Sequence, residues 1–181
     1  ELLYQLSRYK SSAYTNSTIW ITEVKQMIDK NIECFFMKQS DTFLKPASEV
    51  AVLLDEHNIS HAKILLSQYK YSKVPVINEN REFVGILGWT DIINFEMQHD
   101  FFYEKSDRTP ISEIVNREIA TVQKDYELED ILHLLVGEPF LPVLKGTEFY
   151  GIIPRQEILK AVNAFAHTFT KDYEIIERTN D

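Results

Sequence analysis

Short apolar runs separated by polar turns occur twice along the chain in the same order. The first copy reads Val74-Pro75-Val76-Ile77, Phe83-Val84-Gly85-Ile86 and Asp91-Ile92-Ile93. The second copy reads Leu141-Pro142-Val143-Leu144, Phe149-Tyr150-Gly151-Ile152 and Glu157-Ile158-Leu159. The order, the spacing and the residue types agree, with one residue fewer in the loop of the second copy. A duplicated structural unit explains such agreement better than chance.

Each copy predicts the same succession of elements. Short apolar runs between turn residues are typical of buried strands, and apolar positions three and four apart are typical of helices. The first copy predicts a strand at 48–54, a helix capped by Asn58 or Ser60, strands at 74–77 and 83–87, and a helix at 89–97. The second copy predicts a strand at 119–123, a helix at 128–136, strands at 141–144 and 149–153, and a helix from Pro154. We therefore expect an α+β fold in which two tandem β-α-β-β-α motifs pack as one module, because a unit of about 60 residues buries little core alone.

Flanking helices complete the predicted organisation. Ile28, Ile32, Phe35 and Phe36 would share one face of a helix near the start of the chain. We divide the chain into an extension or tag-like segment at 1–26, an N-terminal helix at 27–41, a first motif at 42–98, a linker at 99–112, a second motif at 113–167 and a tail at 168–181. We expect the tail to continue the last helix.

Composition narrows the classes of function. The 181 residues include 19 Lys and Arg against 28 Asp and Glu, which corresponds to a formal net charge of −9. Proteins that bind nucleic-acid polymers or anionic membranes carry a basic face, so this balance argues against both partners but allows a local basic pocket. Cys34 is the single cysteine, which excludes an intramolecular disulfide and favours a reducing compartment. No apolar run approaches the roughly 18 residues of a membrane span, and the first residues lack a signal-peptide profile, so we expect a cytoplasmic protein.

The repeated pattern resembles the cystathionine-β-synthase (CBS) motif pair, often called a Bateman module. The resemblance covers about residues 42–167 and rests on the two hydrophobic-Pro-Val strands and on the Gly-x-x-x-x-x-Asp/Glu segments that follow them. Among such proteins the chain looks closest to the small stand-alone CBS proteins of Gram-positive bacteria that bind cyclic di-AMP. The closer similarity is carried by Ala51-Val-Leu-Leu with His57-Asn58, Leu65-Leu-Ser-Gln68, Phe83-Val-Gly-Ile-Leu-Gly88 with Asp91-Ile92, Ile158-Leu-Lys-Ala-Val-Asn163 and Lys171-Asp-Tyr-Glu-Ile175.

The resemblance implies a ligand site at the last strand–helix junction of each motif. In the family, a Ser or Thr caps this helix and an Asp lies one turn further in, so that free N–H groups attract phosphate and the carboxylate accepts ribose hydroxyls. At the first junction Gly88 replaces the hydroxyl residue while Asp91 remains. At the second junction Pro154 would occupy the first helical turn, where it removes one N–H donor, and Glu157 keeps the acidic charge. Gln156 departs from the basic pair that some relatives carry.

Arg155 is the candidate phosphate ligand at the second junction. A guanidinium binds phosphate bidentately, and a cation at a helix start is mildly unfavourable without such a role. The resemblance implies that two further segments complete the pocket, namely Val50, Ala51 and Leu53, and Tyr71, Ser72 and Lys73. The apolar run at 50–53 would form a core strand with or without a ligand, and Tyr71 could either stack on adenine or pack against Pro75. Lys70 and Lys73 could offset the ligand's negative charges.

No other group of residues predicts chemistry. His57 and His61 lie four residues apart, a spacing that allows metal binding on one helical face, but the sequence places no third ligand nearby. The chain has no P-loop, nucleophile elbow or dinucleotide-binding glycine fingerprint. Trp89 could close a second, pseudo-symmetric pocket or simply pack in a dimer contact, and we favour packing. We therefore expect no catalysis, no cofactor and no metal.

Two classes of function follow from these patterns. The resemblance implies a non-catalytic sensor that binds cyclic di-AMP, or else AMP or ATP, in the cleft between its motifs and regulates a partner such as a (p)ppGpp synthetase/hydrolase or pyruvate carboxylase. The alternative is a degenerate CBS dimer that acts as a protein-interaction scaffold, which Gly88, Pro154 and Gln156 motivate. We expect a homodimer in either case, because apolar helix faces would otherwise be exposed. The candidate interface residues are Phe95, Ile158, Val162 and Phe165.

Overall fold

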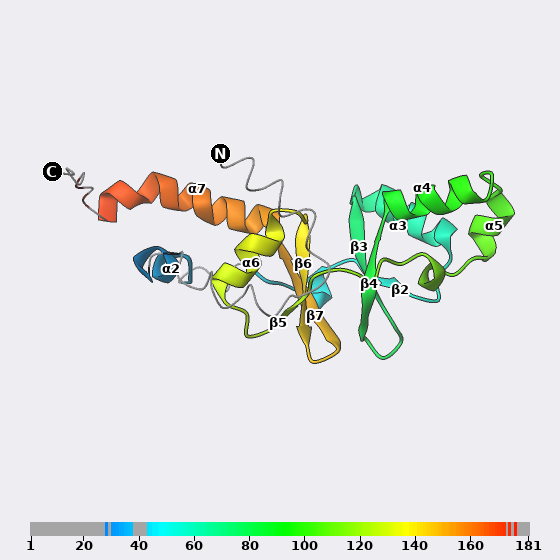
Figure 1. Ribbon diagram of the computed structural model, residues 1–181, viewed down its shortest axis with the longest axis horizontal. Coiled ribbons are helices and arrows are strands. Elements are labelled where there is room, and N and C mark those ends of the chain that lie inside the picture. The colour runs from blue at the N-terminus through cyan, green and yellow to red at the C-terminus, as the bar shows by residue number, and fades with distance from the viewer. Residues whose placement is uncertain (1–27, 29, 38–42, 173, 175, 177–181) are drawn as a thin grey trace, which may run out of the picture.

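Two lobes of like construction follow one another along the long axis of the molecule (Figure 1). The computed structural model describes residues 28, 30–37, 43–172, 174 and 176. The first lobe consists of β2 (Leu53–Leu54), α3 (Ile59–Tyr69), β3 (Lys73–Ile77), β4 (Phe83–Gly88) and α4 (Trp89–Gln98). The second lobe repeats this order with β5 (Val122–Gln123), α6 (Leu128–Leu135), β6 (Phe140–Lys145), β7 (Glu148–Pro154) and α7 (Arg155–Asp172). The predicted α+β fold with tandem β-α-β-β-α motifs is confirmed.

Each lobe contains a small sheet with the same pairing. In the first sheet β2 runs parallel to β3, and β3 runs antiparallel to β4. In the second sheet β5, β6 and β7 pair in the same way. A further strand, β1 (Lys45–Pro46), lies at the start of the first motif in the chain but pairs antiparallel with β7. The start of the first motif therefore completes the sheet of the second lobe, which ties the two lobes together.

The first strand of each motif is shorter than the apolar pattern predicts. Residues Ala47–Glu49 form a 3-10 turn (η2), and only Leu53–Leu54 pair with β3. In the second motif the prediction began at residue 119, but pairing with β6 begins at Val122. The apolar character of residue 50 has another cause, because Val50 packs between the lobes rather than in a sheet.

Local side-chain chemistry accounts for the helix ends. Asn58 caps α3, because its side-chain oxygen accepts the N–H of His61 at 2.8 Å. The helix ends at Lys70, which adopts a left-handed conformation with φ 56°. The last helix, α7, continues to Asp172, so the expected helical continuation beyond residue 168 is present.

The segment that joins the motifs is more ordered than a plain linker. It contains a short helix, α5 (Tyr103–Arg108), and a 3-10 turn, η3 (Ile111–Glu113). Ile111 is fully buried in the core of the first lobe, and its N–H donates to the carbonyl of His57 at 2.7 Å. The connection is therefore part of the first lobe's packing.

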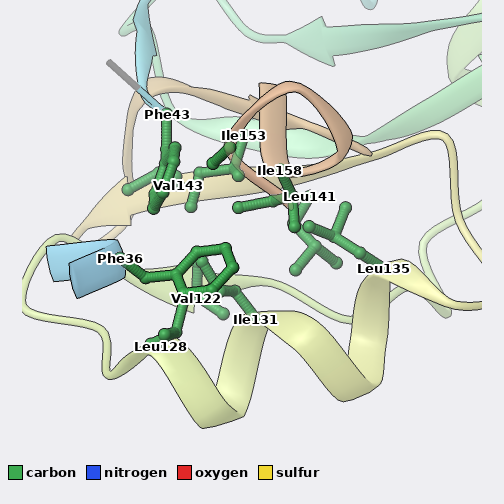
Figure 2. Packing of buried hydrophobic residues seen from close by; sticks show 11 residues of the cluster. Phe36, Phe43, Val122, Leu128, Ile131, Leu135, Leu141, Val143, Ile153 and Ile158 are labelled. Atoms are coloured by element: carbon green, nitrogen blue, oxygen red, sulfur yellow. The ribbon is translucent and has the colours of Figure 1, made fainter. Parts of the chain in front are cut away.

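The lobes have separate hydrophobic cores. In the second lobe, α2 (Lys30–Met37) lies against the core, and Phe36 points into it (Figure 2). Ile32 and Phe35 pack against the same cluster, which confirms the predicted apolar helix face for these residues, and Ile28 packs there from outside the helix. The buried members of this core are Phe36, Phe43, Val122, Leu128, Ile131, Leu135, Leu141, Val143, Ile153, Ile158 and Ala161.

A third apolar cluster joins the lobes. Ile77, Leu144 and Phe149 are its buried members. The rings of Phe83 and Phe149 stack with centroids 6.1 Å apart. The N–H of Phe83 donates to the carbonyl of Thr147 at 3.0 Å, and the N–H of Phe149 donates to that of Arg81 at 2.9 Å. These reciprocal contacts relate the two motifs by a pseudo-twofold axis, so the motifs pack as one module.

Two of the expected dimer contacts are instead core residues. Phe95 is only 8% exposed in the first-lobe core, and Ile158 is only 5% exposed in the second. Phe165 packs against Phe35 and Phe36 of α2 within the same chain. Val162 is 43% exposed and is the one member of the four that remains largely at the surface. The error arose because helical periodicity identifies an apolar face but not the element that covers it.

Glu96 connects three helices of the first lobe. Its Oε1 accepts Lys63 Nζ of α3 at 2.7 Å and the buried hydroxyl of Ser106 of α5 at 2.9 Å. The hydrogen bond from Lys63, opposed by burial and assisted by Ser106, lowers the pKa of the Glu96 carboxyl from its ordinary value of 4.5. A carboxyl with a lowered pKa stabilises the fold above the ordinary value and loses this effect as the pH falls through the lowered one.

We expect Glu96→Gln to lower the free energy of unfolding by about 1.5 kcal/mol at pH 7, because a charge-assisted hydrogen bond is lost. The difference from the unsubstituted protein should shrink as the pH falls below 4.5 and through the lowered pKa of Glu96, because the unsubstituted protein then also loses the charge. Urea unfolding at pH 7 and at acidic pH measures both effects. Glu104→Gln is the control, because Glu104 is exposed and lies 3.8 Å from an exposed Arg108. A difference that grows on acidification would contradict this account.

Candidate functional site

A cavity of about 320 Å³ opens at the last strand–helix junction of the first motif. This volume falls at the lower end of the range for small-molecule sites. The lining comes from the start of β3, from the β4–α4 junction and from the segment that leads into β5. The lining residues are Ser72, Lys73, Ile86, Gly88, Trp89, Thr90, Asp91, Asn116 and Ile119.

The junction itself is held by main-chain and carboxylate contacts. The N–H of Gly88 donates to Asp91 Oδ2 at 2.8 Å, so the carboxylate one turn into α4 closes back on the cap residue. The N–H of Trp89 donates to the carbonyl of Ser72 at 3.3 Å, which joins α4 to the start of β3. Remaining N–H groups of the first turn of α4 and the positive end of its dipole are features that favour an anion. Asp91 can accept hydroxyl groups beside them.

Gly85 allows the second motif to form one wall of this cavity. Ile86 and Asn116 exchange two main-chain hydrogen bonds, each 2.9 Å long. A Cβ atom at Gly85 would lie 2.3 Å from the carbonyl oxygen of Asn116, so only glycine permits this approach. The segment before β5 is therefore held directly against β4.

The second junction repeats this arrangement with different chemistry. A Cβ atom at Gly151 would lie 2.2 Å from the carbonyl oxygen of Lys45, the counterpart of the Gly85 contact. Pro154 is the last residue of β7, opposite Phe140, and α7 begins at Arg155, so the prediction that proline occupies the first helical turn is wrong by one residue. Proline still has no N–H to donate there. Glu157 therefore cannot accept from residue 154 the hydrogen bond that Asp91 accepts from Gly88.

Glu157 and Arg155 have other partners at the second junction. The Glu157 carboxylate accepts Lys160 Nζ at 2.9 Å and lies 3.9 Å from Lys45 Nζ. The Arg155 main-chain N–H donates to the carbonyl of Pro139 at 2.9 Å, and its exposed guanidinium donates to the carbonyl of Val136 at 3.2 Å. The carbonyl of Val136 lies at the negative C-terminal end of α6, which accounts for a cation in this position.

An ion pair connects the two junctions. Lys73 Nζ, at the edge of the first cavity, lies 2.9 Å from Glu138 Oε2, and both side chains are partly exposed. Glu138 immediately precedes Pro139, whose carbonyl accepts the start of α7. The starts of β3 and β6 therefore lie close together, and the two junctions adjoin across the Lys73–Glu138 pair.

The structure brings together some of the site residues chosen from the sequence. Ser72, Lys73 and Asp91 line the first cavity, while Pro154, Arg155 and Gln156 stand at the second junction. Trp89 also lines the cavity and packs against the first-lobe core. Its favoured role in a dimer contact stays a prediction.

The prediction that Leu53 contacts a ligand is wrong. Its side chain is fully buried in the first-lobe core, so it cannot contact a ligand. Val50 packs against the cluster between the lobes, and Ala51 is half-buried. Tyr71 is 43% exposed and stacks on Tyr69 with ring centroids 5.7 Å apart, which leaves it accessible beside Ser72.

The sequence did not identify three residues in or beside the site, namely Asn116, Ile119 and Glu138. Asn116 reaches the cavity only because it pairs with Ile86, thirty positions earlier, and no local pattern marks that pairing. Glu138 had no signal either, since a single acidic residue in a loop is ordinary surface chemistry.

The histidine pair shows no sign of metal binding. Among the described residues, no cluster of three or more His, Cys, Asp or Glu side chains could hold a metal ion. The rings of His57 and His61 lie 4.3 Å apart, and His57 Nδ1 accepts the N–H of Leu54 at 3.2 Å. Burial, with a further contribution from His61, lowers the pKa of His57, which agrees with a neutral ring that accepts this hydrogen bond.

Within the described ranges, no helix combines the length and the apolar character needed to cross a bilayer.

Comparison with known proteins finds the same duplicated unit. The family model for the CBS domain matches twice, at residues 44–97 and 111–164. The cyclic di-AMP receptor B of Bacillus subtilis (strain 168) is 24% identical over 132 residues, which cover 71% of this chain and 89% of the receptor. A CBS domain protein from Streptococcus pneumoniae TIGR4 is 45% identical, with a TM-score of 0.74, and the match covers 78% of this chain and 98% of that one. CbpB in complex with c-di-AMP is 34% identical, with a TM-score of 0.70, and the match covers 80% of this chain and 100% of that one. Two matches to one family model, in two lobes related by a pseudo-twofold axis, lead to one conclusion: the chain belongs to the CBS domain family.

Proposed function

We propose that the protein is a non-catalytic adenine-nucleotide sensor that binds cyclic di-AMP in the cleft between its two CBS motifs. The observation that carries the proposal is the cavity at the first junction, where Asp91 and the start of α4 meet Lys73. Similarity to proteins named for cyclic di-AMP binding supports the choice of ligand.

The two junctions would serve different parts of the ligand. An adenosine fits the first cavity, where Asp91 can accept ribose hydroxyls and Trp89 and Ile119 supply apolar surface. The phosphates, which carry the charge, would lie toward Lys73 and the exposed guanidinium of Arg155. Tyr71 offers an exposed ring beside Ser72 for the second base, because an aromatic face accepts any base by stacking. Val50, Ala51, Pro154 and Gln156 remain candidate contacts at the second junction.

Isothermal titration calorimetry with cyclic di-AMP, AMP and ATP tests this function. We expect saturable binding of cyclic di-AMP that is tighter than binding of either mononucleotide, because two bases and two phosphates are engaged. Adenosine serves as the uncharged control. Absence of heat with all of these ligands at high concentration would rule out the sensor. Appearance of linear product after incubation with cyclic di-AMP would contradict the non-catalytic part.

The output of such a sensor would be a regulated partner, for which a (p)ppGpp synthetase/hydrolase or pyruvate carboxylase is the candidate, in the cytoplasm. We propose no cofactor and no metal. A change in the partner's activity on addition of the ligand-free protein, reversed by cyclic di-AMP, measures this output.

We also propose a homodimer. Ile93 of α4 and Leu159 of α7 occupy equivalent positions in the repeat, and they are 46% and 59% exposed. Together with Val162 they leave apolar surface on both helices, which a second copy would cover. Size-exclusion chromatography with light scattering measures the assembly.

The scaffold remains the second candidate. It is favoured by the proline at the second junction and by the engagement of Glu157 with Lys45 and Lys160. A dimer that binds none of the nucleotides would support it.

A further inference from the structure

We infer that the Glu138 carboxylate is an internal competitor for phosphate at Lys73, and that it lowers the affinity of the cleft for anionic ligands. The inference rests on the function proposed above and identifies a residue that sets the affinity of that site. The Glu138 carboxylate lies outside the hydrophobic cores and is not part of the cavity lining, and the proposed function gives it no other role.

Lys73 is held where it can meet a ligand. It is the first residue of β3 and pairs with Gly88 across the sheet, at the cap of α4. A Cβ atom at Gly88 would lie 3.0 Å from Lys73 Cγ, so the lysine stem runs directly over the cap residue. The Lys73 ammonium group therefore extends from the cavity edge, next to the start of α4, where an anion would be placed.

In the structure that ammonium group is already neutralised. Glu138 Oε2 lies 2.9 Å from Lys73 Nζ, a short charge-assisted hydrogen bond. The Lys73 and Glu138 side chains are 37% and 30% exposed, so the pair is open to solvent and to a ligand. A surface pair of this kind is weak enough for a ligand to break.

A phosphate that contacts Lys73 must displace this carboxylate or share the lysine with it. In either case the ligand's negative charge approaches that of Glu138, and the repulsion subtracts from binding. Glu138 belongs to the second motif and Lys73 to the first, so displacement also breaks an ion pair between the lobes. Where the carboxylate is displaced, the occupied and empty states differ in this one contact between the lobes.

Removal of the Glu138 charge tests the inference. Glu138→Gln keeps the shape and leaves an amide oxygen for Lys73, so we expect the variant to fold with an unchanged melting temperature to within a few degrees. Cyclic di-AMP should bind about fivefold more tightly than to the unsubstituted protein, as expected for loss of one partly screened repulsion. Adenosine should bind equally to both proteins, because it carries no phosphate. A merely structural effect would change the affinities for cyclic di-AMP and adenosine alike.

Two further variants sharpen the test. Glu104→Gln removes the same charge from an exposed site in the first lobe and should alter affinity less than twofold. In a Lys73→Met background, Glu138→Gln should give much less of the gain, because its competitor role requires the lysine. Equal or weaker cyclic di-AMP binding by Glu138→Gln, while the unsubstituted protein binds it, overturns this inference and leaves the proposed function standing. Binding by neither protein overturns the proposed function itself, whereas binding by the variant alone supports the inference.

Discussion

Replacement of Gly85 by alanine should lower the free energy of unfolding by about 3 kcal/mol, the upper part of the range for overpacked sites. The added Cβ would lie 2.3 Å from the carbonyl oxygen of Asn116 and 2.9 Å from Val115 Cγ2. The nearest of these atoms belongs to the main chain, which cannot rotate away as a side chain can. The segment before β5 would have to move, and with it one wall of the cavity.

Gly137→Ala is the matched control, because no atom lies within 4 Å of a Cβ built at that glycine. We expect it to change stability by less than about 0.5 kcal/mol. Gly151→Ala repeats the test in the second lobe, where the carbonyl of Lys45 would lie 2.2 Å away. Urea unfolding measures all three, and nucleotide titration of Gly85→Ala should show weakened binding. A loss below about 1 kcal/mol at Gly85, well under the overpacking range, would mean that the Asn116 segment moves freely.

Replacement of Arg155 by alanine should weaken cyclic di-AMP binding by about thirtyfold, because a charge-assisted contact with phosphate is lost. Adenosine binding should not change. The guanidinium now donates to the carbonyl of Val136 at the end of α6, where water can replace it because the group is exposed. Arg155→Lys should recover only part of the affinity, since an ammonium group lacks the planar two-point contact.

Arg108→Ala provides the control for this prediction. Arg108 is 81% exposed on α5, at the end of the first lobe away from the second (Figure 1), and within the described residues its one ionic partner is Glu104 at 3.8 Å. Its loss removes the same formal charge without touching either junction, so calorimetry should give nearly the original dissociation constant. Equal affinities of Arg155→Ala and the unsubstituted protein would remove Arg155 from the site and confine phosphate binding to Lys73.

The first strand–helix junction was predictable, because it is encoded in a short stretch of chain. The run Phe83-Val-Gly-Ile-Leu-Gly88 predicts a buried strand that ends at a glycine, and Asp91 then lies one turn into the helix. The observed hydrogen bond from the Gly88 N–H to Asp91 joins residues three positions apart. The N-cap role of Asn58 is equally local. Contacts of this range depend little on the rest of the fold.

The predictions that were wrong or missing concern contacts between segments that are far apart in the chain. Leu53 was assigned to the ligand site and is a core residue, because an apolar residue in a strand does not reveal which side of the sheet will be covered. Phe95 and Ile158 were assigned to a dimer contact for the same reason. The short strand β1 was not foreseen at all, since its partner β7 lies about a hundred positions further along the chain.

The duplication, the order of elements and the chemistry at the first junction thus follow from the chain alone, because periodicity, caps and turns act among near neighbours. Tertiary packing decided the rest. It placed Asn116 against Ile86 and Lys45 against Gly151, and it joined Lys73 to Glu138. Each of these contacts unites segments that are far apart in the chain, and they form only when distant strands pair and the two lobes pack together. The cleft is a product of that packing, and its charge balance could not be known before the lobes were assembled.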